Sequence, residues 1–249
     1  MGTRCSARSL GTFSLAARSA ARPPLRGPAA LIVEQSESVR YQRLCWHTMQ
    51  IFWDNSNIYI SAQKSASALN PSDPPSRVRV YFRNLIALVA RGRQIDNAFV
   101  AGSIPPPGDE VWRFMAQSGV GRPVLYERVL GPGGTSYEQG VDERILLGIS
   151  NALLDEAPGT MALLTGDGAE QEVGVSFTAS VRRAAKLGWQ IELYSWERAL
   201  SGALRSEVNA AGGRVILLDG FYPSITFVPA SPYDTYERIV NPLPSPLGI

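Results

Sequence analysis

From Met49 to Leu217 the chain alternates short apolar runs with amphipathic segments, and this alternation restricts its fold more than any other feature. Continuous apolar runs are typical of strands that are covered on both faces, whereas apolar residues three or four apart are typical of helices. The alternation therefore predicts an α/β fold, with a mainly parallel sheet and helices on both faces. Strands are predicted at 49–53, 97–101, 124–128, 161–164, 190–194 and 214–217, and helices at 56–63, 77–91, 109–117, 141–154, 177–187 and 197–205.

The 249 residues are enough for one ordinary domain with tails. We expect the domain to span 49–228, followed by an irregular tail rich in Pro and Ser over 229–249. Residues 1–48 are rich in Arg, Ala, Ser and Pro, a composition that resembles a transit peptide. We interpret them instead as a disordered extension or a misassigned start, with Met49 as the alternative start. This interpretation predicts a cytoplasmic protein, and a mitochondrial or plastid one if the transit peptide is genuine.

Histidine and cysteine are missing from the predicted domain. The two cysteines are Cys5 and Cys45, and the single histidine is His47. This excludes a disulfide framework, a cysteine-based zinc site and Ser-His-Asp catalysis within the domain. Carboxylates remain for chemistry, and they favour hard cations such as Mg²⁺ or Mn²⁺. No apolar run is long enough to span a bilayer, so no membrane partner is expected, and nothing in the sequence indicates a homo-oligomer.

Three aspartates occupy comparable positions in the predicted elements. Asp54 ends the first strand, Asp167 follows the strand that begins at Met161, and Asp142 lies in the first turn of the helix from Val141. The carboxyl ends of parallel strands share one edge of a sheet, where such folds bind ligands. Three acids at that edge repel one another unless a divalent ion neutralises them. The acids therefore predict a metal site that hydrolyses a phosphodiester.

Each of these acids also has a purely structural interpretation. Asp54 is a candidate cap of the following helix, Asp142 is favoured by the helix dipole, and Asp167 is suited to a turn. The combination of all three favours a site. Asn57 and Thr165 are secondary candidates that orient a water or a phosphate, and Glu170 is a candidate further ligand.

Three motifs in this order resemble the NYN domain family, which belongs with the PIN-like ribonucleases. Ile51-Phe-Trp-Asp-Asn-Ser-Asn57 resembles its opening strand, and Gly140-Val-Asp-Glu143 resembles its second acidic motif. Leu163-Leu-Thr-Gly-Asp-Gly-Ala-Glu170 resembles its third motif, and the resemblance covers roughly Met49 to Leu218. It implies a Rossmann-like, three-layer PIN-like fold and RNA cleavage with Mg²⁺ or Mn²⁺. Asp54, Asp142 and Asp167 are the implied metal ligands, with Asn57 in support.

One position departs from the family pattern, which commonly has a second aspartate two residues after Asp167. Ala169 stands there, and Glu170 follows. The leading hypothesis is a metal-dependent endoribonuclease, and the alternative is a weak or inactive NYN domain that binds RNA or acts as a scaffold. A nucleotide-binding or phosphatase-like enzyme ranks third, because the chain lacks a Gly-x-Gly-x-x-Gly motif after the first strand and lacks a Walker loop.

RNA binding requires cationic side chains near the acids. Residues after position 48 include 17 basic and 20 acidic side chains, so a local patch has to supply the contacts. The candidates with substrate-binding roles are Arg182, Arg183 and Lys186, on the polar side of one predicted helix. Their structural interpretation is a solvated helix face.

Overall fold

The computed structural model describes residues 48–104, 110–120, 124–127, 129–130, 136–137, 140–168 and 176–245. The extension predicted for residues 1–48 lies outside the described residues, apart from its last position. In the described ranges no helix is both long enough and apolar enough to cross a bilayer.

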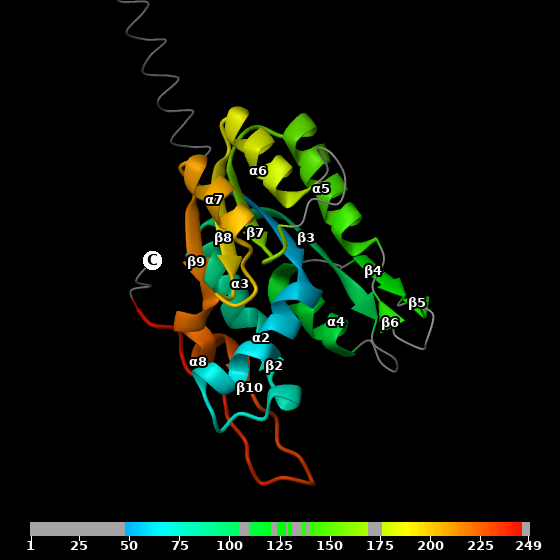
Figure 1. The fold of residues 1–249 in the computed structure, drawn as a ribbon, viewed down its shortest axis with the longest axis vertical. Helices are drawn as coiled ribbons and strands as arrows, with labels where there is room; N and C mark the ends of the chain where they lie inside the picture. Colours follow the sequence, from blue (N-terminus) through cyan, green and yellow to red (C-terminus); the bar gives the residue numbers. More distant parts are fainter. Residues whose placement is uncertain are drawn as a thin grey trace, which may run out of the picture. The chain divides into compact units, whose positions relative to one another are not determined.

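Six parallel strands form the central sheet (Figure 1). Its order across the sheet is β4-β3-β1-β7-β8-β9. The chain therefore moves outward from β1 in one direction, then returns to β7 on the other side of β1 and moves outward again. This is the doubly wound strand order, and it confirms the predicted Rossmann-like fold. The strands are β1 (Thr48–Asp54), β3 (Gln94–Ile104), β4 (Val124–Glu127), β7 (Thr160–Leu164), β8 (Gln190–Ser195) and β9 (Arg214–Leu217).

Two hydrophobic clusters cover the two faces of this sheet. Side chains alternate between the faces, so Ile51 and Trp53 belong to one cluster while Phe52 belongs to the other. The first cluster includes side chains of α2 (Asn55–Leu69), α3 (Phe82–Ala90) and α4 (Glu110–Met115). The second includes side chains of α5 (Val141–Asp155), α6 (Phe177–Lys186) and α7 (Gly202–Ala210). Helices on both faces are therefore confirmed.

The helix predicted over 77–91 begins later than its periodicity indicates. Pro75–Arg77 form a 3₁₀ turn, Arg79–Val80 form β2, and α3 begins at Phe82. β2 pairs in antiparallel fashion with β10 (Thr226–Phe227). The backbone of the first turn of the predicted helix therefore pairs with a strand almost 150 residues further along the chain. Local periodicity does not reveal such a distant partner.

Two further segments differ from their predicted structure. The helix predicted at 197–205 is α7, which begins at Gly202 because the Ser201 hydroxyl caps it by accepting the amide of Leu204 at 3.1 Å. The region predicted as a loop before Gly140 contains β6 (Ser136–Tyr137), which pairs in antiparallel fashion with β5 (Val129–Leu130).

The segment after β9 is fastened to the domain through a buried carboxylate. It comprises a 3₁₀ turn (Leu218–Phe221), α8 (Tyr222–Ile225), β10 and residues 229–245, which have no helix or strand. Asp73 accepts the hydroxyls of Tyr222 and Tyr236, each at 2.6 Å, and the Arg238 guanidinium at 2.9 Å. Burial alone would raise the pKa of Asp73, but these hydrogen bonds outweigh it and lower that pKa. Figure 1 shows the segment beside β2 and α2.

A second buried carboxylate joins β8 to β9 and to the turn before β3. The Glu192 side chain is only 5% exposed, and it accepts hydrogen bonds from Arg93 at 2.7 Å, Arg214 at 2.7 Å and the Tyr194 hydroxyl at 2.9 Å. Arg91 pairs with it as well. Burial would raise the pKa of Glu192, but the hydrogen bonds from Arg93 and Arg214 and the charges of Arg93 and Arg91 lower that pKa to about 2.

This lowered pKa predicts how stability depends on pH. Ionised Glu192 stabilises the folded state above its ordinary pKa of 4.5, and that contribution is lost as the pH falls through about 2. We expect Glu192→Gln to lower the free energy of unfolding by about 3–5 kcal/mol at neutral pH, because three arginines lose their buried partner. The variant should also lose less stability than the wild type between pH 4.5 and 2. Denaturant unfolding at a series of pH values measures both effects.

Glu207→Gln is the matched control. Glu207 pairs with Arg182, whose side chain is 53% exposed, so its loss should cost less than about 1 kcal/mol. Equal destabilisation by the two substitutions would contradict the role assigned to Glu192.

Candidate active site

The candidate site lies where β1 and β7 end side by side. Trp53 of β1 pairs with Leu164 of β7, so Asp54 and Thr165 are the next residues on two neighbouring parallel strands. β1 and β7 are also the strands from which the chain departs in opposite directions. Ligands of doubly wound folds bind at this point of the sheet, outside the carboxyl ends of the strands.

Asp54 is held by hydrogen bonds to both of its carboxylate oxygens. The residue is 5% exposed. Its Oδ1 accepts the amide of Asn57 at 2.9 Å, which caps α2. Its Oδ2 accepts the Thr165 hydroxyl at 3.3 Å. Asp54 therefore both ends β1 and caps α2, as expected. The two hydrogen bonds hold its carboxylate in one position.

Asn57 connects α2 to the turn after β7. Its side-chain oxygen accepts the amide of Gly166 at 2.9 Å. The carbonyl of Gly166 in turn accepts the amide of Ser201 at 2.9 Å. A Cβ atom at position 166 would lie 2.5 Å from the carbonyl oxygen of Ala199. The turn is therefore clamped between the start of α2 and the segment before α7, and only glycine fits.

Thr165 brings Asp167 to Asp54. The Thr165 side chain is fully buried. Its hydroxyl oxygen accepts a hydrogen bond from the amide of Asp167 at 3.2 Å, and its O–H donates a hydrogen bond to Asp54. A single hydroxyl thus separates the Asp54 carboxylate from the Asp167 backbone. Asp167 itself is half-buried. The role of Thr165 in supporting a site stays a prediction, and these two hydrogen bonds are consistent with it.

Asp142 lies in the first turn of α5, after the left-handed Gly140. Because α5 leads into the start of β7, its own start lies at the edge where β7 ends. Within the described ranges, no three Asp, Glu, His or Cys side chains are grouped closely enough to hold a metal ion. Asp54, Asp142 and Asp167 therefore share an edge without forming such a group, and Glu170 lies outside the described residues.

The donor chemistry of this edge nevertheless fits a hard divalent cation. Mg²⁺ is usually held by one or two carboxylates together with several waters. The Thr165 hydroxyl joins the Asp54 carboxylate to the backbone amide of Asp167, whose side chain is a second carboxylate at this edge. A third carboxylate is therefore not a requirement for binding such an ion.

Of the predicted substrate-binding cations, Arg183 and Lys186 lie in the last turn of α6, and Arg182 lies in its middle. Arg182 pairs with Glu207 of α7 through its Nε at 3.0 Å. Arg183 and Lys186 line a shallow apolar pocket together with Leu153, Leu154 and Leu187. α6 ends just before Gln190, which pairs with Thr160 at the opposite edge of the sheet. The length of β7, roughly 16 Å, separates the two edges.

The contacts of Ala199 and Ser201 with Gly166 were not anticipated from the sequence. The sequence feature that reflects these contacts is the pair of glycines on either side of Asp167. A Cβ atom at Gly168 would also be too close to another segment, at 1.9 Å from the Ser201 hydroxyl. Two glycines in such a short turn indicate a close approach of another segment, but they do not say which segment approaches.

The close approach at Gly166 predicts a specific loss of stability. We expect Gly166→Ala to lower the free energy of unfolding by about 1–3 kcal/mol, because backbone atoms of Ala199 have to move. Gly202→Ala is the matched control, since nothing lies within 4 Å of its added Cβ; alanine in the first turn of α7 should be neutral or mildly stabilising. Chemical denaturation of both variants measures this, and a stable Gly166→Ala protein would show that the turn is not clamped.

Comparison with known proteins agrees with this architecture. A solved structure of a protein of unknown function from Vibrio parahaemolyticus is similar to this chain with a TM-score of 0.50 and 14% sequence identity, over 70% of this chain and 93% of that one. At this identity the likeness shows the fold alone. No curated protein matches the sequence. The family model described as NYN domain matches residues 48–211. This match covers more than half of the chain and runs from β1 to the end of α7, so the chain belongs to the NYN domain family.

Proposed function

We propose that the chain is a metal-dependent endoribonuclease that hydrolyses phosphodiester bonds of RNA with Mg²⁺ or Mn²⁺. The NYN domain family is a PIN-like nuclease family, which makes RNA the expected substrate. The observation that supports the proposal most is the buried Thr165 hydroxyl between the Asp54 carboxylate and the Asp167 amide. This hydroxyl joins the ends of β1 and β7, and doubly wound folds bind ligands at this point of the sheet.

Asp54 and Asp167 are the proposed main ligands of the cation. Asp142 is proposed as a third carboxylate at the same edge, and Glu170 as a supporting ligand. When bound, such a cation lowers the pKa of a coordinated water and stabilises negative charge on the phosphate.

The chain's own residues have distinct roles in this proposal. The two hydrogen bonds to Asp54 hold its carboxylate in one orientation, so that its charge faces the substrate without rearrangement. Asn57 uses its oxygen on the Gly166 amide, so its amide nitrogen is the atom suited to donate to a phosphate oxygen. Thr165 positions both acids and contacts neither the phosphate nor the leaving group.

The alternative function is an RNA-binding module without turnover. Ala169 favours it, because the family commonly has a further aspartate at this position. RNA binding without cleavage in Mg²⁺ or Mn²⁺ would establish this alternative, and cleavage that requires the metal would exclude it.

Charge-neutral variants of the acids test the nuclease proposal. Asp54→Asn retains an oxygen that caps α2, because asparagine is as good a cap as aspartate, but it removes the charge. We expect this variant and Asp167→Asn to reduce the rate of RNA cleavage in Mn²⁺ by more than 100-fold. Thr165→Val, which removes only the positioning hydroxyl, should reduce that rate about 10- to 100-fold. The measurement is cleavage of a labelled RNA by the full chain, with EDTA as the metal-free reference.

Asp96→Asn is the control, because Asp96 is an exposed residue near the start of β3, at the opposite edge of the sheet. It should cleave RNA at the wild-type rate. Full activity of Asp54→Asn and Asp167→Asn, each with its fold intact, would refute the proposed site. Activity retained by Asp142→Asn alone would restrict the ligands to two carboxylates.

A further inference from the structure

A cavity of about 610 Å³ lies between α2, β2, α4 and β10. Its volume is within the range of cavities that bind small molecules. Its walls consist mainly of aromatic rings and arginines rather than aliphatic side chains. The lining residues used below are Tyr59, Arg79, Tyr81, Phe82, Phe114 and Phe227.

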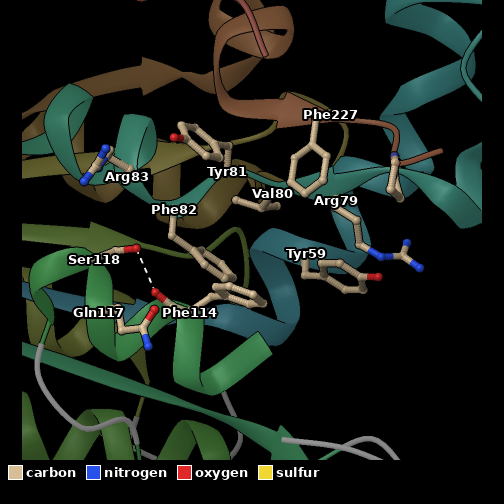
Figure 2. Close-up of a pocket in the computed structure, with 11 residues that line it drawn as sticks. Tyr59, Arg79, Val80, Tyr81, Phe82, Arg83, Phe114, Gln117, Ser118 and Phe227 are labelled. Carbon is tan, nitrogen blue, oxygen red and sulfur yellow. Dashed lines mark hydrogen bonds between the residues drawn. The ribbon is translucent and has the colours of Figure 1, made fainter. Parts of the chain in front are cut away.

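The rings surround the cavity from several elements. Figure 2 shows Tyr59, Phe82 and Phe114 on one side of Val80, and Tyr81 and Phe227 on the other. Tyr81 and Phe227 meet edge to face, with their centroids 6.3 Å apart. Phe114 is 62% exposed, although it is one of the largest apolar side chains of the chain. An exposed ring beside other partly exposed rings is suited to stacking against a flat ligand.

The charge of the cavity is positive. Arg79 and Arg83 line it, and among the residues that the structure describes none that lines it is acidic. The Arg79 guanidinium lies 5.9 Å from the centre of the Tyr59 ring, and hydrogen bonds to the carbonyls of Ser76 and Val78 hold it there. A cation fixed beside a ring provides contacts for a phosphate and for a base at the same place.

The cavity lies at the same edge of the sheet as Asp54. Phe82, at the start of α3, packs edge to face on Trp53 with centroids 5.7 Å apart, and Trp53 directly precedes Asp54. Tyr59 follows Asp54 by five residues, a rise of about 7.5 Å along α2. Figure 1 shows β2 and β10 beside α2, at the end of the sheet toward which β8 points. Two or three stacked nucleotides, at about 3.4 Å each, cover the rise along α2 from Asp54 to Tyr59, which lines the cavity.

We propose that this cavity binds an unpaired nucleobase of single-stranded RNA, two or three nucleotides from the phosphate held at Asp54. Phe114 and Tyr59 stack against the base, and Arg79 contacts the adjoining phosphate. Aromatic stacking accepts any base but requires that base to be unstacked from its neighbours, so the cavity selects single strands over duplexes. The inference rests on the proposed function and specifies which form of RNA the site accepts.

Substitution of Phe114 tests this inference with little risk to the fold, because the ring is mostly exposed. We expect Phe114→Ala to weaken binding of a short fluorescent single-stranded RNA by roughly 5- to 150-fold, as the loss of one stacked base does. Phe114→Trp should retain wild-type affinity because it keeps a ring. Fluorescence anisotropy with the full chain in EDTA measures binding without turnover. Binding of duplex RNA should not change in either variant.

Two further measurements separate stacking from charge and locate the base. Arg79→Ala should reduce the slope of log affinity against log salt concentration by about one phosphate contact, whereas Phe114→Ala should leave that slope unchanged. An RNA with an abasic nucleotide two or three positions from the cleavage point should bind the wild type more weakly than the intact RNA does. The Phe114→Ala variant should bind both RNAs equally.

Tyr233→Ala is the matched control, because Tyr233 is 96% exposed and does not line the cavity. It should bind RNA like the wild type. If Phe114→Ala binds and cleaves single-stranded RNA like the wild type, the inference is wrong, the cavity serves another ligand such as a peptide, and the nuclease proposal stands. If the wild type binds RNA through Phe114 but never cleaves it, the nuclease proposal fails and the base-binding cavity stands.

Discussion

The pair of side-chain hydrogen bonds between the ends of β1 and β7 is the constraint on which the candidate site depends. Asn57 accepts the Gly166 amide, and Thr165 donates to Asp54. Each bond joins residues more than 100 positions apart in the chain. Because β1 and β7 are neighbours only through the doubly wound strand order, this order brings the two acidic motifs together. The Thr165 hydroxyl then joins the Asp54 carboxylate to the backbone amide of Asp167.

Both ends of the sheet use buried charge, but for different purposes. At the amino end, Glu192 meets three arginines, and their hydrogen bonds and charges lower its pKa to about 2 despite its burial. At the carboxyl end, the charge of Asp54 is met by an amide and a hydroxyl, which are neutral donors. A buried carboxylate at the end of a strand is costly unless it is paired or binds a cation. Glu192 therefore has a structural role, whereas Asp54 lies at the end of the sheet where doubly wound folds bind ligands.

The sequence predicted the sheet and the positions of Asp54, Thr165 and Asp167 at the ends of strands, because both depend on local signals. Apolar runs that end in Asp54 or in Thr165-Gly-Asp167 reveal strands and the polar residues that follow them. The pairing of β2 with β10 has no such signal, since it joins segments almost 150 residues apart. For the same reason the clamp between Asp73 and Arg238, and the aromatic cavity drawn from residues 59 to 229, could not be predicted. The polar face of α6 indicated cationic candidates, but periodicity does not reveal that Arg182 faces Glu207.

The central claim is that Asp54 and Asp167 hold a divalent cation at the junction of β1 and β7. Electron paramagnetic resonance of Mn²⁺ titrated with the full chain tests it without any assumption about substrate, because the signal reports the free ion. The account predicts a binding site in the wild type that Asp54→Asn and Asp167→Asn each abolish, while Asp96→Asn retains it. Mn²⁺ binding of equal strength and stoichiometry in all four proteins would contradict it.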